Sequence, residues 1–139
     1  MSSTVLLALD GSEYQARFLG GVAWRPPRPH LGAEAALVSF LAESAPVLSA
    51  AHDVSDGGLA VAVAELALWS KRGADVEIGD DAVNWFGEGG GLAVISCRPE
   101  DVERLGDTVP LRRIGKVVGD AILGAPLARL RAAHEGGER

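Results

Sequence analysis

One segment of the chain combines residue types that contact anions and cations. Residues 51–60 read AHDVSDGGLA, so an apolar run ends and a new apolar run begins across two glycines. The first N–H groups of a helix have no partner within the helix, and glycine lets an anion approach the backbone closely. The candidate contacts to a phosphate or a nucleotide are Asp53, Ser55, Asp56, Gly57 and Gly58.

The two carboxylates of this segment leave a second interpretation open. They would repel a bare phosphate, so a ligand role needs a divalent cation, or a hydroxyl or amine of the ligand, close by. Alternatively, Asp56 is simply the N-cap of the following helix, a position that aspartate often occupies. From the residues alone, helix capping and ligand contact are equally good accounts.

A second glycine cluster, FGEGGG at residues 86–91, precedes another apolar run. No Gly-Lys-Ser/Thr follows either cluster, and neither has the Gly-x-Gly-x-x-Gly spacing of a dinucleotide site. A run of glycines in this position is more typical of a hairpin or of a loop that enters a strand. Residues 89–91 could also cradle a ligand, but a loop is the better account of them.

The histidines and the cysteine do not form a catalytic or metal-binding set. The three histidines are scattered, and only His52, next to Asp53, is placed to act. A hydrogen-bonded, half-buried histidine is a better account of His52 than a general base. Cys97 lies in an apolar run without an activating neighbour and is expected to be a small buried hydrophobe. We assign no catalytic residue and no metal ligand.

The elements that must position these residues follow from periodicity. Apolar spacing predicts a helix over 33–44 and an enclosed helix over 59–71. The buried stripe of the first helix is expected to consist of Ala33, Ala36, Leu37, Phe40 and Leu41. Short apolar runs predict a buried strand over 47–54 and a central strand over 92–97. The remaining elements are expected as strands over 4–9, 75–78 and 114–118, helices over 12–18, from Pro99 and over 126–133, and a frayed tail over 135–139. This alternation predicts an α/β (α+β) layered sandwich with a mixed β-sheet.

Composition excludes several classes of protein. The 139 residues suit a single domain, 1–139, and the net charge of −6 argues against a nucleic-acid binder. A single cysteine excludes an intramolecular disulfide framework and a thiolate zinc cluster. No apolar run is long enough to span a membrane, and no signal peptide is recognisable. We therefore expect a soluble, cytoplasmic protein without a membrane partner.

Residues 52–65, HDVSDGGLAVAVAE, resemble a signature of the large (synthetase) subunit of phosphoribosylformylglycinamidine synthase, near its C-terminus. Residues 9–14 resemble that family's Leu-Gly-Gly-Ser-Glu-Tyr stretch, and residues 86–88 and 113–119 match two later landmarks in order. The resemblance covers nearly the whole chain. In two places the chain departs from the pattern: Asp10 replaces a glycine, and residues 89–92 replace a Ser-x-Gly-Arg run. The second change removes an arginine that would pair with an anion.

The resemblance implies a fold like the C-terminal domain of aminoimidazole ribonucleotide synthetase, and a chain that is the last C-terminal half of a larger, duplicated enzyme. The family is an ATP-dependent ligase of purine biosynthesis that uses Mg²⁺. It converts formylglycinamide ribonucleotide to formylglycinamidine ribonucleotide with ammonia from glutamine. The implied partners are the N-terminal half, a glutaminase subunit and a small adaptor subunit. The family's catalytic histidine, phosphate-binding lysine and magnesium carboxylates lie mostly in segments that this chain lacks, so the chain alone should be inactive.

Two other classes of function remain open at the level of sequence. Other members of the superfamily, such as aminoimidazole ribonucleotide synthetase, thiamine-monophosphate kinase or hydrogenase-maturation proteins, carry a similar Asp-x-Ser/Thr-x-Gly-Gly-Leu turn. The chain could also be a non-catalytic nucleotide-binding or assembly module. A half-enzyme should expose an apolar docking face, so a homodimer is expected for the isolated chain.

Overall fold

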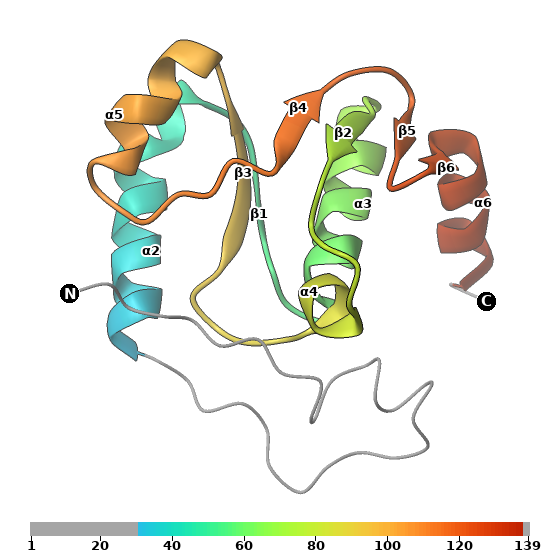
Figure 1. Cartoon of the computed structure of the whole chain (residues 1–139), viewed down its shortest axis with the longest axis horizontal. Helices are drawn as coiled ribbons and strands as arrows, with labels where there is room; N and C mark the ends of the chain where they lie inside the picture. Colours follow the sequence, from blue (N-terminus) through green and yellow to red (C-terminus); the bar gives the residue numbers. More distant parts are fainter. Residues whose placement is uncertain (1–30, 138–139) are drawn as a thin grey trace, which may run out of the picture.

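The computed structural model describes residues 31–137, and the strand and helix expected within residues 1–30 lie outside this range. Figure 1 shows two groups of elements around a central helix, α3. The elements are α2 (Leu31–Ser44), β1 (Leu48–Asp53), α3 (Gly58–Ser70), β2 (Ala74–Val76), α4 (Ala82–Phe86), β3 (Ala93–Cys97), α5 (Val102–Gly106), β4 (Gly115–Val117), β5 (Ala121–Ile122), β6 (Ala125–Pro126) and α6 (Leu127–Gly137), with single 3₁₀ turns at Ala45–Val47 and Pro99–Asp101.

The first sheet consists of β1 and β3, paired antiparallel with Asp53 opposite Ala93. Both strands were expected, but the prediction that β1 is a buried strand is wrong, because half-buried and exposed residues alternate along it. Within residues 31–137, β3 pairs only with β1, and every residue of β3 is half-buried. The prediction that β3 is central to its sheet also depends on residues 1–30, which lie outside the described range. The apolar run over β1 indicated burial on both of its faces, which the described elements do not provide.

The second sheet has the order β4-β2-β5-β6. Its β2–β5 pair is parallel and its other pairs are antiparallel, so the predicted mixed sheet is present. β2 and β4 confirm the strands expected near residues 75–78 and 114–118. α4, β5 and β6 were not predicted, because elements of two to five residues leave almost no periodic signal.

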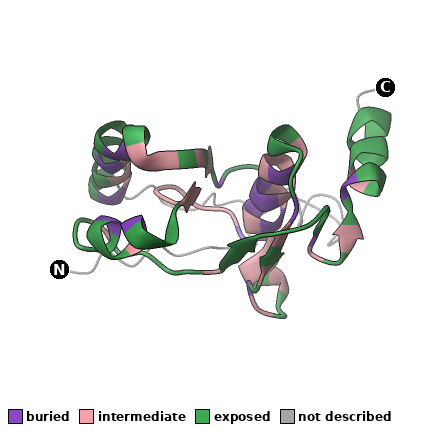
Figure 2. Ribbon diagram, turned by 90° about the horizontal axis from the view of Figure 1, so that it is seen from above, coloured by how far each residue is buried: buried purple, intermediate pink, exposed green. Residues whose placement is uncertain are grey.

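The core forms where α3 meets the second sheet and α6. Val63 and Ala67 of α3 pack with Ile122 and Leu127, and partly buried apolar residues surround this cluster. Figure 2 shows the buried positions concentrated on α3. The prediction of an enclosed helix over 59–71 is therefore confirmed. The helix ends at Ser70, and its C-cap, Lys71, adopts a left-handed conformation with φ of 58°.

The other helices largely agree with the sequence. α2 buries Ala33 and Phe40 as expected, although Ala36 of the predicted stripe is exposed. The helix expected from Pro99 begins as a 3₁₀ turn and continues as α5. α6 extends to Gly137, so the tail expected to fray from residue 135 is helical up to that point. Among the helices described, none has the length and apolar character needed to cross a membrane.

Candidate functional site

The candidate segment forms a tight turn between β1 and α3. β1 ends at Asp53, and the Gly58 N–H donates a hydrogen bond to the Ser55 carbonyl at 3.0 Å. Gly57 is the N-cap of α3 in a left-handed conformation, with φ of 87°, and no side chain caps the helix from this position. The interpretation of Asp56 as the N-cap is therefore wrong, because the backbone reverses at Gly57, one residue later.

A carboxylate from a distant loop occupies the start of α3. The Gly57 N–H donates to Oε1 of Glu88 at 2.8 Å, and the contact is partly buried. This is the geometry in which a helix N-terminus binds an anion, because the free N–H groups and the helix dipole both favour negative charge. The sequence predicted a turn suited to an anion, and the group that lies there in the structure is the chain's own carboxylate, which the sequence did not identify.

Gly58 brings the same two segments into direct backbone contact. It has φ of 73°, and a Cβ placed on it would lie 2.6 Å from the carbonyl carbon of Phe86 and 2.9 Å from the carbonyl oxygen of Gly87. Real Cβ atoms do not approach backbone atoms this closely. The glycine at position 58 is thus explained by packing against residues 86–87, whether or not a phosphate also approaches it.

The glycine run that follows Glu88 packs against the start of α2. A Cβ at Gly90 would collide with the Glu34 carboxylate, and one at Gly91 would lie 3.2 Å from the Cβ of Ala33. Residues 86–91 therefore bridge the N-terminal ends of α3 and α2 before they enter β3. This is the strand-entry loop that the sequence predicted, and the contacts give its glycines a packing role.

The polar side chains of the turn face outward. Asp53, Ser55 and Asp56 are all exposed, with the Asp53 side chain at 74% of its full accessibility. Nowhere in residues 31–137 do three or more histidine, cysteine, aspartate or glutamate side chains form a group that could hold a metal ion. The described turn therefore offers at most two carboxylates to a cation, and Mg²⁺ held by so few side chains also needs oxygens from water or a ligand.

His52 is enclosed beside the turn. Its side chain is 8% exposed, its Nε2 lies 2.7 Å from Oε2 of Glu65, and its Nδ1 contacts the Asp53 carbonyl. The ring also stacks on Trp69, with centroids 4.9 Å apart and planes 12° from parallel. Both ring nitrogens are engaged with acceptors, so His52 is the hydrogen-bonded structural residue that we expected, and it links β1 to α3.

Cys97, at the end of β3, is half-buried, and its environment disfavours the thiolate. Burial raises the pKa of the Cys97 thiol above its ordinary value of 9.0, and the nearby carboxylates of Asp101 and Glu100 raise it further. A thiol of this kind is a poor nucleophile, as expected for a cysteine without an activating neighbour. The prediction that Cys97 is buried is wrong in degree, because the residue is only half-buried.

Comparisons with known proteins identify the group to which this arrangement is similar. Residues 4–126 match the family described as AIR synthase related protein, C-terminal domain. The phosphoribosylformylglycinamidine synthase subunit PurL of Thermobifida fusca is 41% identical over 93% of this chain and 19% of its own length. The PurL subunit of Erythrobacter litoralis is 45% identical over 63% of this chain and 14% of its own.

A solved structure shows the same fold. The chain titled T. maritima PurL complexed with FGAR superposes with a TM-score of 0.71 over 90% of this chain, at 16% sequence identity. The match covers 26% of that longer chain. The matched part of this chain covers less than a fifth of the length of each curated relative described above, 19% of one and 14% of the other.

Proposed function

The chain belongs to the AIR synthase related protein, C-terminal domain family, and from that premise we propose that it is the C-terminal domain of a phosphoribosylformylglycinamidine synthase. The observation that carries this proposal is the match to PurL subunits along almost the entire chain. The complete enzyme is then an ATP-dependent ligase of purine biosynthesis that works in the cytoplasm. It converts formylglycinamide ribonucleotide to the amidine with ammonia from glutamine.

Within that enzyme, this chain, 1–139, supplies the last C-terminal half of a duplicated architecture, in which an N-terminal and a C-terminal half each occur twice. Its partners are the N-terminal half of the same enzyme, a glutaminase subunit and a small adaptor subunit. ATP and Mg²⁺ are assigned to the complete enzyme, and we derive no step through the metal from this chain, because residues 31–137 hold no group of three or more metal-ligating side chains. The chain alone should not hydrolyse ATP in response to formylglycinamide ribonucleotide, and such hydrolysis would contradict this assignment.

The turn over residues 53–58 contacts the ligand through its outward face. The exposed carboxylates of Asp53 and Asp56 and the hydroxyl of Ser55 can meet ligand hydroxyl groups or waters around a cation. A phosphate can reach the Gly57 N–H only if it replaces Glu88, which already accepts that hydrogen bond. Gly58, packed on the backbone of residues 86–87, holds the turn in place.

Substitutions in the complete enzyme test the assignment of the turn. Asp53→Ala and Ser55→Ala should raise KM for the nucleotide or for the ribonucleotide substrate, while the fold, measured by circular dichroism, stays unchanged. Asp107→Ala is the matched control, because Asp107 is exposed and lies in another loop. Equal kinetic constants in all three variants would show that the turn does not contact the ligand.

An assembly module is the second candidate function, and the Glu88–Gly57 hydrogen bond favours it. In this interpretation the turn serves to join residues 53–58 to residues 86–88, because the chain's own carboxylate already occupies the helix N-terminus. Calorimetric titration of the isolated chain with ADP and Mg²⁺ separates the two. A binding heat that is lost in the Asp53→Ala variant supports contact between the turn and the ligand. The absence of binding, together with a dimer in solution, supports an assembly module.

A further inference from the structure

β4 lies at the edge of the second sheet and is open to solvent. In the order β4-β2-β5-β6, its one neighbour among the described elements is β2. All three residues of β4 are exposed, and Val117 and the following Val118 each keep 48% of their accessible surface. An open strand edge with exposed β-branched residues is a site at which an extended segment can pair.

The register shows which backbone groups point away from the sheet. Asp75 pairs with Lys116, the Val118 N–H donates to the Gly73 carbonyl at 3.0 Å, and the Glu77 N–H donates to the Ile114 carbonyl at 2.7 Å. Hydrogen-bonded pairs alternate along an antiparallel ladder, so the backbone groups of Lys116 face β2. The N–H and C=O groups of Gly115 and Val117 consequently face outward and are available to another strand.

The charge along this edge is opposite to that of the whole chain. Residues 108–119 contain Arg112, Arg113 and Lys116 and no acidic residue, whereas the chain carries −6 overall. None of these three cations takes part in an ion pair within residues 31–137. The edge therefore presents three unpaired cations around its free hydrogen-bonding groups.

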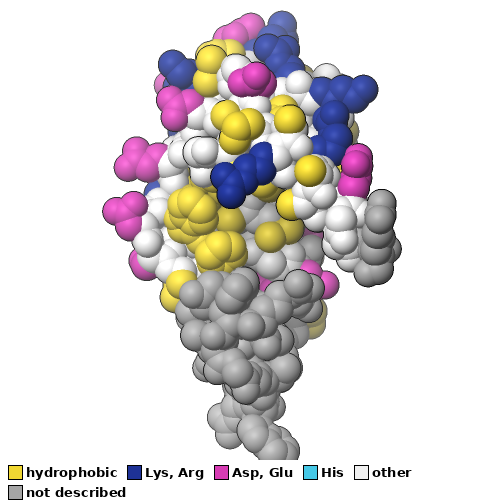
Figure 3. Space-filling model, turned by 90° about the vertical axis from the view of Figure 1, so that its right-hand side faces the viewer, with side chains coloured by type: hydrophobic (Ala, Val, Ile, Leu, Met, Phe, Trp, Pro, Cys, Tyr) yellow, Lys and Arg dark blue, Asp and Glu magenta, His cyan; other side chains and the backbone are white. Residues whose placement is uncertain are grey.

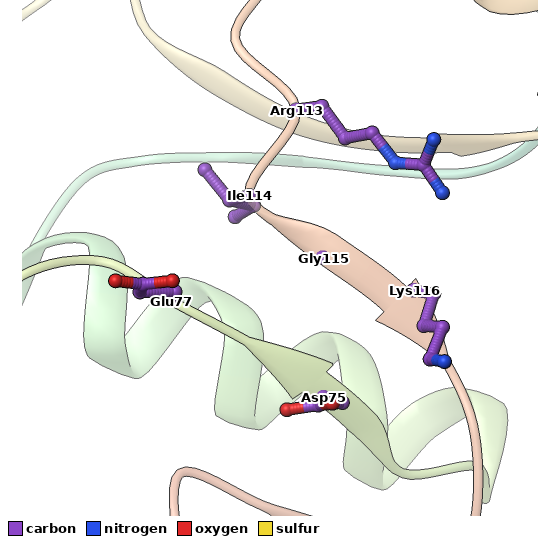
Figure 4. Close-up of a pocket in the computed structure, with 6 residues that line it drawn as sticks. All are labelled: Asp75, Glu77, Arg113, Ile114, Gly115 and Lys116. Atoms are coloured by element: carbon purple, nitrogen blue, oxygen red, sulfur yellow. The ribbon is translucent and has the colours of Figure 1, made fainter.

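A shallow hollow of about 230 Å³ continues from the edge onto the neighbouring strand. Figure 4 shows that its cations, Arg113 and Lys116, come from β4 and the segment before it, whereas Asp75 and Glu77 come from β2 and its end. The carboxylates therefore lie on the β2 side of the hollow. A segment that adds to the outer edge of β4 meets the cations first.

We propose that the free edge of β4 binds an extended, acidic segment of another polypeptide as an added strand. The outward groups of Gly115 and Val117 supply main-chain hydrogen bonds, Arg112, Arg113 and Lys116 supply charge complementarity, and Val117 and Val118 supply apolar contact. The same cations disfavour pairing of β4 with β4 of a second copy, because two identical basic edges repel each other.

The probe for this surface is a capped peptide of about eight residues, an ordinary strand length, in which glutamate alternates with valine. Its binding to the full chain is measured by calorimetry, and backbone amide exchange is followed by NMR. We expect saturable binding that weakens with added salt, and protection of the Val117 amide only in the presence of peptide. A Val117 amide that is already protected in the free chain would overturn the proposal, because the edge would then be covered.

Matched variants separate strand addition from plain charge attraction. Val117→Pro removes an outward N–H and should abolish binding, whereas Val117→Ala keeps that N–H and should bind. Arg113→Ala should weaken binding about threefold, as expected for an exposed charge pair, whereas Arg129→Ala on α6 should have no effect.

Peptide analogues provide the same test without altering the protein. A peptide with alternate N-methylated amides and one with lysine in place of glutamate should both fail to bind. Binding of the N-methylated peptide as tight as that of the parent peptide would overturn strand addition. The proposal would also be overturned if two copies of the chain paired through their β4 edges in a concentration-dependent way and this pairing competed with the acidic peptide.

Discussion

At the scale of single residues, Gly57 and Glu88 join segments 31 positions apart in the chain. The hydrogen bond between them gives the Phe-Gly-Glu landmark a physical role, because its carboxylate stabilises the positive end of α3. At most helix starts a local Ser, Thr, Asn or Asp side chain accepts a hydrogen bond from a free backbone N–H, and here a carboxylate from a distant loop accepts it instead. The turn and the loop therefore depend on each other for their conformations.

Removal of the Glu88 carboxylate should destabilise the chain. Glu88→Ala leaves the Gly57 N–H without its acceptor, and we expect a loss of about 1–2 kcal/mol in the free energy of unfolding, measured with urea. Glu88→Gln keeps a neutral acceptor and should lose less. Equal stability of the wild type and Glu88→Ala would mean that this hydrogen bond contributes nothing in solution.

Two glycine substitutions distinguish close packing from backbone strain. Gly58 and Gly124 both have positive φ, but a Cβ would collide with the Phe86 backbone at position 58 and meets nothing within 4 Å at position 124. Gly124→Ala should cost about 1–2 kcal/mol, the price of a left-handed alanine, in thermal or urea unfolding. Gly58→Ala should cost about 3 kcal/mol or more. Similar losses for both would show that the contact with residues 86–87 is dispensable.

Alkylation of Cys97 should depend on pH in a defined direction. Because the pKa of its thiol is raised above 9.0, the thiolate fraction at pH 8 is smaller than for an ordinary cysteine, and the rate with iodoacetamide should still be rising above pH 9. Glu100→Gln removes one cause of the raised pKa, so it should increase the rate at pH 8, by less than about tenfold. Glu103→Gln on α5 is the control for the change in net charge. A rate profile with its midpoint below that of a free cysteine would contradict the assigned environment.

At the scale of elements, sequence patterns predicted those that are long or strongly apolar. α2 and α3 have 14 and 13 residues, enough to show which positions are apolar and where the run ends. β5 and β6 have two residues each and became strands only through their neighbours in space. The burial of β1 was overestimated because an apolar run does not reveal how many of its faces will be covered. The turn at residues 53–58 was predictable because its residues are neighbours in the sequence. Its partner Glu88 was not, because a local pattern does not reveal which distant segment will lie against it.

β1 and α3 should be coupled through His52. The ring is held between Glu65 of α3 and the Asp53 carbonyl and is covered by Trp69. Glu65→Ala leaves a nearly buried ring nitrogen without its acceptor, and we expect a loss of about 1–3 kcal/mol in urea unfolding. Glu43→Ala, at an exposed position of α2, is the control and should change stability little. Two variants of equal stability would show that the His52–Glu65 contact does not hold β1 to α3.

At the scale of the whole molecule, the chain shows surfaces that suit a part of a larger assembly. On the face that carries α6, hydrophobic side chains gather between acidic side chains along one rim and basic side chains toward the opposite side (Figure 3). α2 adds an exposed apolar stripe, because Leu31, Ala35, Val38 and Ala42 follow helical spacing and all four are exposed. Single exposed apolar residues are ordinary, but an ordered stripe of them is typical of a contact face.

This stripe leads to a prediction about the isolated chain. Without the remainder of the enzyme, two copies can bury their α2 stripes against each other, and the average mass measured by sedimentation should rise with protein concentration. Val38, which is 68% exposed, lies in the middle of the stripe, so Val38→Glu should abolish the association by placing a charge in an apolar contact. Ala36→Glu adds the same charge at an exposed position on another side of α2 and should leave association nearly unchanged. A chain that stays monomeric at every concentration would contradict self-association, and equal effects of the two variants would place the contact elsewhere on the molecule.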